Sequence, residues 1–318
     1  MKLSEIRLLT RGMPRPENPA DQRAMLERLR ALGLDPQNFY QELEMESRFV
    51  DTHRDASFTN SSVQLHSHTF SEVIYCRNTC GVEYLVGTDR YRVQRGDILL
   101  IAPGISHRPL LPENLPEPYT RYVLWISPEL LEILSRLYPR AEPVQGNLLR
   151  TAGTKWEFLG EYFRRGVLET EAGEPGWEMA VLGNTIQILS FLRRAVQDKS
   201  TVPLPAEKPE LLERVMAHME KNLARRITLG DLARQFYVSE STISQLFRKK
   251  MGVSFHRCLT QRRLIAAKSL IEEGCLLEDV GRQVGFVDYS SFYRAFRQEY
   301  GISPRQYRKR MTGEEGNP

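Results

Sequence analysis

The chain has 318 residues, enough for two domains that each bury an apolar core. No apolar run approaches the length that a membrane-spanning helix needs, which argues against a helical membrane protein. The net charge of +4 is unevenly divided, because residues 207–318 hold 20 Lys and Arg against 14 Asp and Glu, whereas residues 1–206 hold 24 Lys and Arg against 26 Asp and Glu. The basic excess, which suits contact with phosphates, therefore lies in the C-terminal part of the chain.

The N-terminal residues predict a cytoplasmic protein with an irregular start. The stretch MKLSEIRLLTRGMPRPENP lacks the apolar core and small-residue cleavage site of a signal peptide. Residues 1–60 are predicted to be a partly helical extension, with one helix near residues 21–32 that Asp21 can cap. The four cysteines form no CxxC pair, so free thiols are expected, with a Cys76–Cys80 bridge or metal pair as the alternative.

Short strand-like runs dominate residues 61–126. They are separated by turn signals such as GTD, RGD and PGIS, and this spacing is typical of an all-β sandwich or barrel. The runs are EVIYC, VEYLV, RYRV, DILLIA and RYVLWI.

Helices are predicted over residues 127–197. Ser127 can cap a helix that starts at Pro128 and stops before Pro139, and two longer helices are expected at about 154–168 and 176–197. The apolar stripe of the last helix is wide enough to pack on the strands and also on a second copy, so we assign dimerisation to this region. Residues 198–209 (DKSTVPLPAEKP) are predicted to be a linker, and residues 311–318 a flexible tail.

A sequence repeat marks residues 210–310. Leu229, Asp231, Leu232 and Gln235 recur 48 positions later, whereas Phe247, Arg248, Gly252 and Ser254 recur 49 positions later. Each copy has the pattern of a helix, a turn and an amphipathic helix, and the one-residue slip falls where the turn is expected. A duplicated helix-turn-helix predicts a protein that binds double-stranded DNA.

The second helix of each copy is predicted to present polar side chains to DNA. Ser239 and Asp288 are expected to cap these helices, and Gly281, at the position of Ala233 in the first copy, indicates close helix packing. Gln245 and Arg294 are the candidates for base contacts, and the other basic side chains for phosphate contacts. The full set is Ser241, Thr242, Ser244, Gln245, Arg248 and Lys249 in the first copy, and Tyr289, Ser290, Tyr293, Arg294, Arg297 and Arg308 in the second.

These residues resemble the AraC/XylS family of transcription regulators over about residues 210–310. The matching positions are Val284-Gly285-Phe286, Asp288, Ser290, Phe292, Phe296-Arg297, Gly301, Ser303-Pro304 and Tyr307-Arg308, with Arg263-Leu264, Ala267 and Leu270 in the connecting helix; Gly281 departs from the usual alanine. The resemblance implies a seven-helix module with two recognition helices in successive major grooves. It also implies promoter binding, RNA polymerase as a partner, and activation more readily than repression.

Three of the six histidines lie in one pattern with an acidic residue. If residues 66–76 form one strand, His66, His68 and Glu72 share a face because their spacings are even, and His107 follows a turn at the end of another strand. The pattern resembles that of cupin barrels, in which HxHx3E precedes a later GxxH, although Ala102 stands where a proline is usual. We therefore expect an α+β multi-domain protein, with an N-terminal cupin-like β-barrel flanked by helices and an all-α C-terminal double helix-turn-helix domain.

The chemistry of this cluster stays open at this point. Three imidazoles and a carboxylate can hold a divalent metal (Ni, Zn, Mn or Fe), bind the hydroxyls of an effector such as a sugar, or serve as satisfied core polar groups. We expect a sensor that responds to a small molecule, with a carbohydrate as the leading class, by shifting the balance between two arrangements of the chain. A metal-dependent cupin enzyme or a metal-responsive sensor fused to a DNA-binding module is the alternative. Our prediction is that the chain is not an enzyme, since no further acid–base group accompanies the motif.

Overall fold

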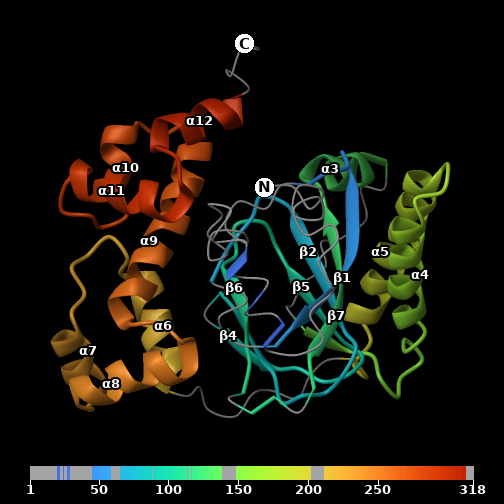
Figure 1. The fold of residues 1–318 in the computed structure, drawn as a ribbon, viewed down its shortest axis with the longest axis horizontal. Helices are drawn as coiled ribbons and strands as arrows, with labels where there is room; N and C mark the ends of the chain where they lie inside the picture. Colours follow the sequence, from blue (N-terminus) through green and yellow to red (C-terminus); the bar gives the residue numbers. More distant parts are fainter. Residues whose placement is uncertain are drawn as a thin grey trace. The chain divides into compact units, whose positions relative to one another are not determined.

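The computed structural model describes residues 45–58, 65–87, 89–112, 114–115, 117–137, 148–201 and 211–312, together with a few positions between 20 and 28. Its residues fall into two compact units, Met1–Ala206 and Glu207–Pro318 (Figure 1). The division falls within the segment 198–209 that the sequence marks as a linker. None of the described helices is both long and apolar enough to cross a membrane.

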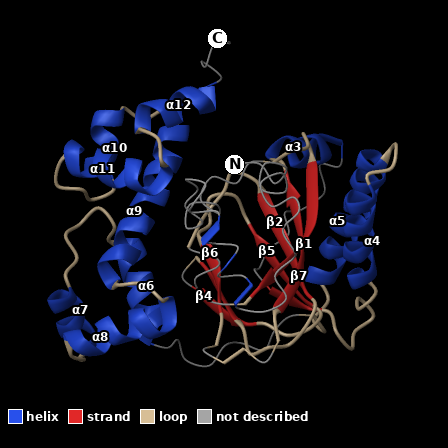
Figure 2. Ribbon diagram, in the orientation of Figure 1, coloured by secondary structure: helices blue, strands red, loops and turns tan. Residues whose placement is uncertain are grey.

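Two antiparallel sheets build the N-terminal unit (Figure 2). The five-stranded sheet has the order β1 (Val50–Ser57), β7 (Tyr119–Ile126), β2 (Ser71–Cys76), β5 (Asp97–Ile101) and β8 (Leu148–Arg150). The three-stranded sheet has the order β4 (Asp89–Arg92), β3 (Glu83–Val86) and β6 (His107–Leu110). All five runs that the sequence marks as strands are strands in the structure.

The larger sheet is buried on both faces. One face packs on the smaller sheet, in a core that joins Ile74 and Leu99 to Tyr84 and Val86. The other face, which carries Val73 and Ile98, packs on three helices, α3 (Pro128–Leu137), α4 (Leu159–Ala172) and α5 (Trp177–Val196). Neighbouring residues therefore serve opposite cores, as the two-residue period of a strand requires.

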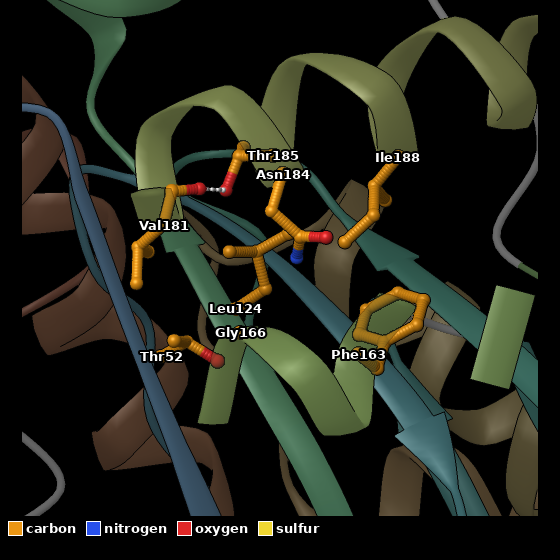
Figure 3. Close-up of a pocket in the computed structure, with 8 residues that line it drawn as sticks. All are labelled: Thr52, Leu124, Phe163, Gly166, Val181, Asn184, Thr185 and Ile188. Carbon is orange, nitrogen blue, oxygen red and sulfur yellow. Dashed lines mark hydrogen bonds between the residues drawn. The ribbon is translucent and has the colours of Figure 1, made fainter. Parts of the chain in front are cut away.

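A narrow space remains where α4 and α5 meet the larger sheet (Figure 3). Asn184 of α5 points into it, and its amide donates a hydrogen bond to the backbone oxygen of Tyr162 at 2.8 Å. A Cβ on Gly166 of α4 would lie 3.1 Å from the same amide nitrogen, so glycine allows α4 and α5 to approach here. The remaining lining residues are Thr52, Leu124, Phe163, Val181, Thr185 and Ile188.

The sheet extends beyond the predicted strand region on both sides. Strand β1 lies within the segment 1–60 that was predicted to be a partly helical extension, and it pairs along its length with β7. Its sequence, VDTHRDAS, conceals a strand because polar residues occupy buried positions: Asp51 accepts backbone hydrogen bonds from Glu46 and Ser47, and Thr52 donates to the oxygen of Val123. Strand β8 likewise lies in the region predicted to be helical and pairs with β5.

The predicted helices of the N-terminal unit are present with shifted ends. Ser127 caps α3, accepting a hydrogen bond from the backbone nitrogen of Leu130 at 3.2 Å. The helix expected from residue 154 begins at Leu159 instead, because Thr154 takes part in turns, binding the oxygen of Thr151 and the backbone nitrogen of Trp156. Of the helix expected at 21–32, only Asp21, Ala24, Glu27 and Arg28 are described, and they are helical; residues 313–318 of the predicted tail lie outside the described residues.

The C-terminal unit is helical throughout its described part. Its elements are α6 (Leu211–Lys221), α7 (Leu229–Phe236), α8 (Glu240–Leu246), the π-helical turn η2 (Phe247–Met251), α9 (Phe255–Glu272), α10 (Leu277–Gln283), α11 (Tyr289–Tyr300) and α12 (Pro304–Thr312). The expected caps Ser239 and Asp288 are in place, and Thr228 caps α7. The side chain of each accepts a backbone hydrogen bond from the first turn of the helix that follows. Helix α9 is the predicted connecting helix between the two copies.

Candidate functional site

The first helix-turn-helix comprises α7, α8 and the turn between them. Thr228 and Asp231 form a reciprocal capping box at the start of α7. Helix α7 ends at Tyr237, whose φ of 57° is the one positive φ of a non-glycine residue in the described chain. Ser239 caps α8, and its hydroxyl also lies 2.7 Å from the hydroxyl of Ser241 and 2.8 Å from that of Thr242. These two predicted DNA contacts thus also belong to the cap.

A π-helical turn follows α8. The sequence predicts one continuous helix over residues 240–250, whereas residues 247–251 are π-helical before Gly252 ends the segment at a φ of 66°. Phe247 remains fully buried, and Arg248, Lys249 and Lys250 are exposed on the opposite side. Lys250 was not among the predicted DNA contacts. Its position directly after Arg248 and Lys249, two predicted phosphate contacts, could have indicated it. Such π turns occur frequently at functional sites.

The second helix-turn-helix comprises α10 and α11. Asp288 caps α11 with a hydrogen bond of 2.6 Å from the backbone nitrogen of Ser291, and hydrogen bonds from Ser291 hold the pKa of Asp288 below its ordinary value. Phe292 and Phe296 are fully buried. A Cβ on Gly281 would lie 2.9 Å from the Cβ of Phe292, which confirms the close packing of α10 on α11 that Gly281 predicted.

The one-residue slip between the copies lies in the turn. Tyr237 and Gly285, 48 positions apart, both have positive φ, and the helix caps Ser239 and Asp288 are 49 positions apart. The second turn therefore holds one more residue between the left-handed position and the cap. This places the slip where the sequence repeat predicted it.

Every side chain predicted to contact DNA lies on the surface of the C-terminal unit. Ser244, Tyr293 and Arg308 are half-exposed, and the remaining nine are exposed. The two recognition helices carry different polar side chains. The first carries short hydroxyls, an amide and three consecutive cations. The second carries Arg294, Arg297 and two tyrosines whose ring centroids lie 6.2 Å apart. Such groups suit base edges and phosphates, the two kinds of contact that DNA presents.

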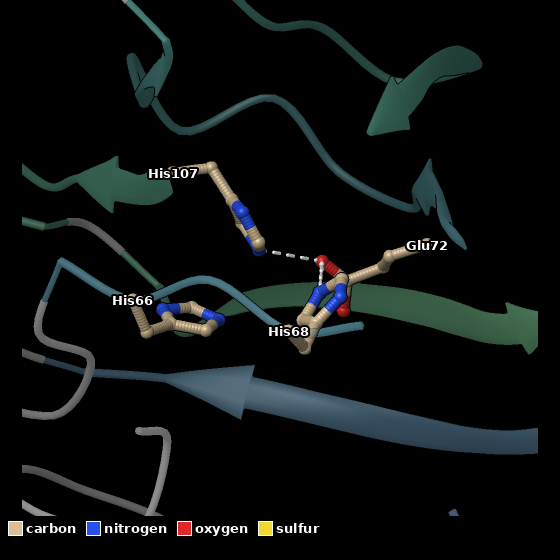
Figure 4. Close-up of side chains that lie close together, drawn as sticks. All are labelled: His66, His68, Glu72 and His107. Carbon is tan, nitrogen blue, oxygen red and sulfur yellow. Dashed lines mark ion pairs between the residues drawn. The ribbon is translucent and has the colours of Figure 1, made fainter. Parts of the chain in front are cut away.

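The second candidate site is the buried cluster of His66, His68, Glu72 and His107 (Figure 4). One ligand atom of each residue lies within 4.8 Å of the others. The four residues are between 1 and 6% exposed, so the group is removed from solvent. The structure thus brings together all four residues of the predicted motif.

Their backbone differs from the single strand that the spacing suggested. Strand β2 begins only at Ser71, and His66 pairs with His107 through an isolated antiparallel bridge. Between His66 and the start of β2 the chain makes a turn, in which Nδ1 of His68 donates to the backbone oxygen of Phe70 at 2.8 Å. The cluster therefore combines a bridge, a turn and two strands.

Hydrogen bonds fix the tautomers of two of the histidines. Carbonyl oxygens accept only, so Nδ1 carries a proton in His68, which faces Phe70, and in His107, which faces the oxygen of Ile105 at 2.9 Å. The Nε2 atoms of both rings are buried and point at Oε2 of Glu72, at 3.6 Å from His68 and 2.8 Å from His107. An unprotonated Nε2 and a carboxylate oxygen both present lone pairs, so a shared proton or a cation would satisfy both atoms.

Electrostatics favour an ionised Glu72. Burial opposes its ionisation, but the imidazoles of His107 and His68 outweigh burial and hold the pKa of Glu72 well below its ordinary value. Burial lowers the pKa of His68, which favours its neutral form. A neutral imidazole and an ionised carboxylate are the forms in which these side chains bind metals.

Two residues outside the motif complete the cluster. The indole of Trp125 on β7 donates to Oε1 of Glu72 at 2.8 Å, and Phe70 stacks on His68 with ring centroids 4.0 Å apart. Trp125 directs the other carboxylate oxygen toward the histidines, as outer partners of metal ligands commonly do. Local sequence spacing carried no signal for Trp125, because β7 pairs with β2 from 53 residues further along the chain.

The chain is similar to a protein-family model, to curated proteins and to solved structures. A family model described as a helix-turn-helix domain matches residues 232–310. The HTH-type transcriptional activator RhaS of Salmonella typhimurium is 24% identical over 249 residues, covering 77% of this chain and 87% of RhaS. The probable transcriptional regulator LumQ of Photobacterium leiognathi is 32% identical over 129 residues, covering 40% of this chain but only 49% of LumQ, about half its length. A DNA-binding transcriptional dual regulator from Escherichia coli K-12 matches at 28% identity over 35% of this chain and 99% of that one, with a TM-score of 0.32.

Proposed function

Because the chain belongs to the AraC/XylS family of transcriptional regulators, we propose that it binds promoter DNA through α8 and α11 and that a small molecule in its N-terminal unit controls this binding. The observation that carries the proposal is the pair of capped recognition helices, each with one buried apolar face and one exposed polar face. Arg294 and Gln245 specify the sequence in this proposal, and Arg248, Lys249, Arg297 and Arg308 bind phosphates.

The test is selection of DNA by the purified chain. Sheared DNA from its own genome is incubated with the protein, and the retained fragments are sequenced. Enrichment of a few promoters that share a bipartite site supports the proposal, and the neighbouring genes indicate the class of the effector. Absence of enrichment at low salt and with candidate effectors present would overturn it.

We propose a carbohydrate as the effector and regulation without turnover. The histidine cluster offers hydrogen-bond donors and acceptors beside the aromatic rings of Phe70 and Trp125, which is the chemistry that sugar hydroxyls require. In this proposal the effector favours one arrangement of the chain and so changes its affinity for DNA, activating transcription with RNA polymerase in the cytoplasm. A change in DNA affinity on adding the sugar, with no chemical change to the sugar, supports a sensor rather than an enzyme.

We further propose that α4 and α5 form the contact of a homodimer. Exposed apolar side chains support this assignment: Met179 is 80% exposed, and Leu168 and Ile186 are each 40% exposed. Analytical ultracentrifugation of the wild-type chain and of Met179→Glu tests it. A wild-type chain that sediments as a monomer at micromolar concentration would refute it.

A second candidate function, metal-responsive sensing, is supported by the convergence of Nε2 of His68 and Nε2 of His107 on Oε2 of Glu72 in the buried cluster. Four ligand atoms of imidazole and carboxylate type fit nickel, zinc, manganese or iron(II), which would neutralise Glu72 and leave positions open to an effector. Metal content of the purified protein, with His107→Ala as the variant and His256→Ala as the matched control, tests this proposal. Equal metal content in all three proteins refutes it, and turnover of a substrate by the loaded protein would favour the enzyme alternative.

A further inference from the structure

Arg263 lies at a junction between the two helix-turn-helix copies. It belongs to α9, the helix that connects them, and is half-buried. Its Nε donates to the backbone oxygen of Leu223 at 3.1 Å, and its Nη2 donates to the backbone oxygen of Arg225 at 2.7 Å. Both acceptors lie in the turn that leads from α6 into the first copy, so the guanidinium holds that turn against α9.

The same guanidinium contacts the turn of the second copy. Its central carbon lies 6.0 Å from the ring centroid of Phe286. A Cβ on the neighbouring Gly285 would lie 2.8 Å from Nη2 of Arg263 and would collide with the backbone oxygen of Leu223. Glycine is thus required here twice, for its φ of 95° and for the close approach of two backbone segments. The side chain of Arg263 and the absence of one at Gly285 bring the turn that leads into the first copy against the turn of the second.

Other charged side chains of α9 contact neighbouring helices rather than the turns. Arg262 is buried and pairs with Glu220 of α6. Arg257 pairs with the buried Glu299 of α11, which also accepts a hydrogen bond from Gln261 at 3.1 Å. These contacts anchor α9 to α6 and to α11, whereas Arg263 contacts both the turn that leads into the first copy and the turn of the second.

We propose that the junction of Arg263 with Gly285 fixes the placement of α8 relative to α11 and thereby sets the spacing between the two DNA segments that the protein binds. Two linked binding modules gain affinity only when their geometry allows both to engage at once. A rigid junction raises the affinity for one spacing and lowers it for the others. A loose junction tolerates several spacings and binds each less tightly.

This inference rests on the proposed binding of DNA by two recognition helices, and the experiment separates the two. The full-length chain first selects a bipartite site from random DNA. Each half of that site, bound by one recognition helix, is called a box. Affinities are then measured for the selected site, for sites with one base pair added or removed between the two boxes, and for a site with one box scrambled. The variants are Arg263→Met, which keeps the apolar stem, and Arg263→Lys, which keeps the stem and the charge. Arg282→Met is the matched control, because the exposed Arg282 pairs only within α10, with Asp279.

Arg263→Met is expected to bind the selected site about tenfold more weakly, a change of about 1.4 kcal/mol. Its penalty for altered spacing falls toward zero, and its affinity for a single box stays at the wild-type value. Arg263→Lys is expected to fall between Arg263→Met and the wild type, and Arg282→Met to keep the wild-type spacing penalty.

Two results would overturn the inference while leaving the proposed function intact. One is an unchanged spacing penalty in Arg263→Met. The other is an equal loss at single-box and bipartite sites, since that indicates damage within one copy rather than to the junction. A wild-type chain that selects no bipartite site would instead refute the proposed function itself.

Discussion

Replacement of Gly281 by alanine sets two physical effects against each other. In the interior of α10, alanine is favoured over glycine by about 1 kcal/mol through helix propensity alone. Against this, the added Cβ would lie 2.9 Å from the Cβ and 3.0 Å from the Cγ of Phe292, whose side chain is fully buried. Neither helix can shift freely, and overpacking of a core costs roughly 1–3 kcal/mol. Gly281→Ala is therefore expected to lower the free energy of unfolding by about 1 kcal/mol.

The first copy shows how the clash is avoided. Ala233 stands at the position of Gly281, and Ile243 stands at the position of Phe292. In the second copy the smaller residue, Gly281, thus faces the larger core residue, Phe292. The double variant Gly281→Ala, Phe292→Ile adopts the combination of the first copy, so it should lose about 1–2 kcal/mol less than the sum of the single variants.

Urea unfolding followed by two probes measures these effects. All three tryptophans, Trp125, Trp156 and Trp177, lie in the N-terminal unit, so their fluorescence should be unchanged in every variant. Far-ultraviolet circular dichroism reports both units and should show the shifted transition of the C-terminal unit. A Gly281→Ala chain at least as stable as the wild type, or strictly additive variants, would refute the argument from packing.

Three further predictions concern recognition, pH and capping. Arg294→Ala should relax base preference at one position by roughly 1–3 kcal/mol, whereas Arg297→Ala should weaken cognate and random DNA alike and reduce the salt dependence; equal losses for both variants would contradict these roles. Burial raises the pKa of Asp97 to about 6, so the folded unit binds this proton more tightly than the unfolded chain does. The contribution of Asp97 to stability is therefore fully present below about pH 4 and is lost as pH rises through 6. Asp97→Asn should remove this loss, gaining roughly 1–3 kcal/mol over wild type at pH 7 in tryptophan-detected unfolding. Ser239→Ala removes the cap on the Thr242 backbone nitrogen and should cost about 1 kcal/mol in the dichroism-detected transition, and an unchanged transition would show the cap to be dispensable.

The sequence predicted the C-terminal unit well because local chemistry determines its helix ends. Ser239, Ser254 and Asp288 each accept a backbone hydrogen bond three residues ahead, and Gly301 ends α11 with a φ of 73°. Such signals are readable without knowledge of distant contacts. The π turn at residues 247–251 escaped prediction because nothing in its sequence separates it from an α-helical end.

The N-terminal unit was less predictable because long-range pairing stabilises polar segments there. Strand β1 carries Asp51, Thr52 and Ser57 at buried positions, and each is satisfied by contacts that the strand alone does not reveal. The histidine motif predicted that four residues lie together, as they do, but from an incorrect local structure. Even spacing suggested one strand, whereas a turn at His68 and a bridge from His66 to His107 bring the residues together.

The two copies of the repeat show what an internal repeat can and cannot predict. Ile243 and Phe292, which are 49 positions apart, both point inward but differ in size. Charge can even reverse: Lys250 is exposed on the π turn, while its counterpart Glu299 is buried and paired with Arg257 of α9. Burial of a carboxylate is tolerated only with such a partner, so this pairing ties α11 to α9 where the first copy has a solvated cation. The repeat thus predicts the backbone frame of both copies, and the differences within it determine how firmly each recognition helix is held.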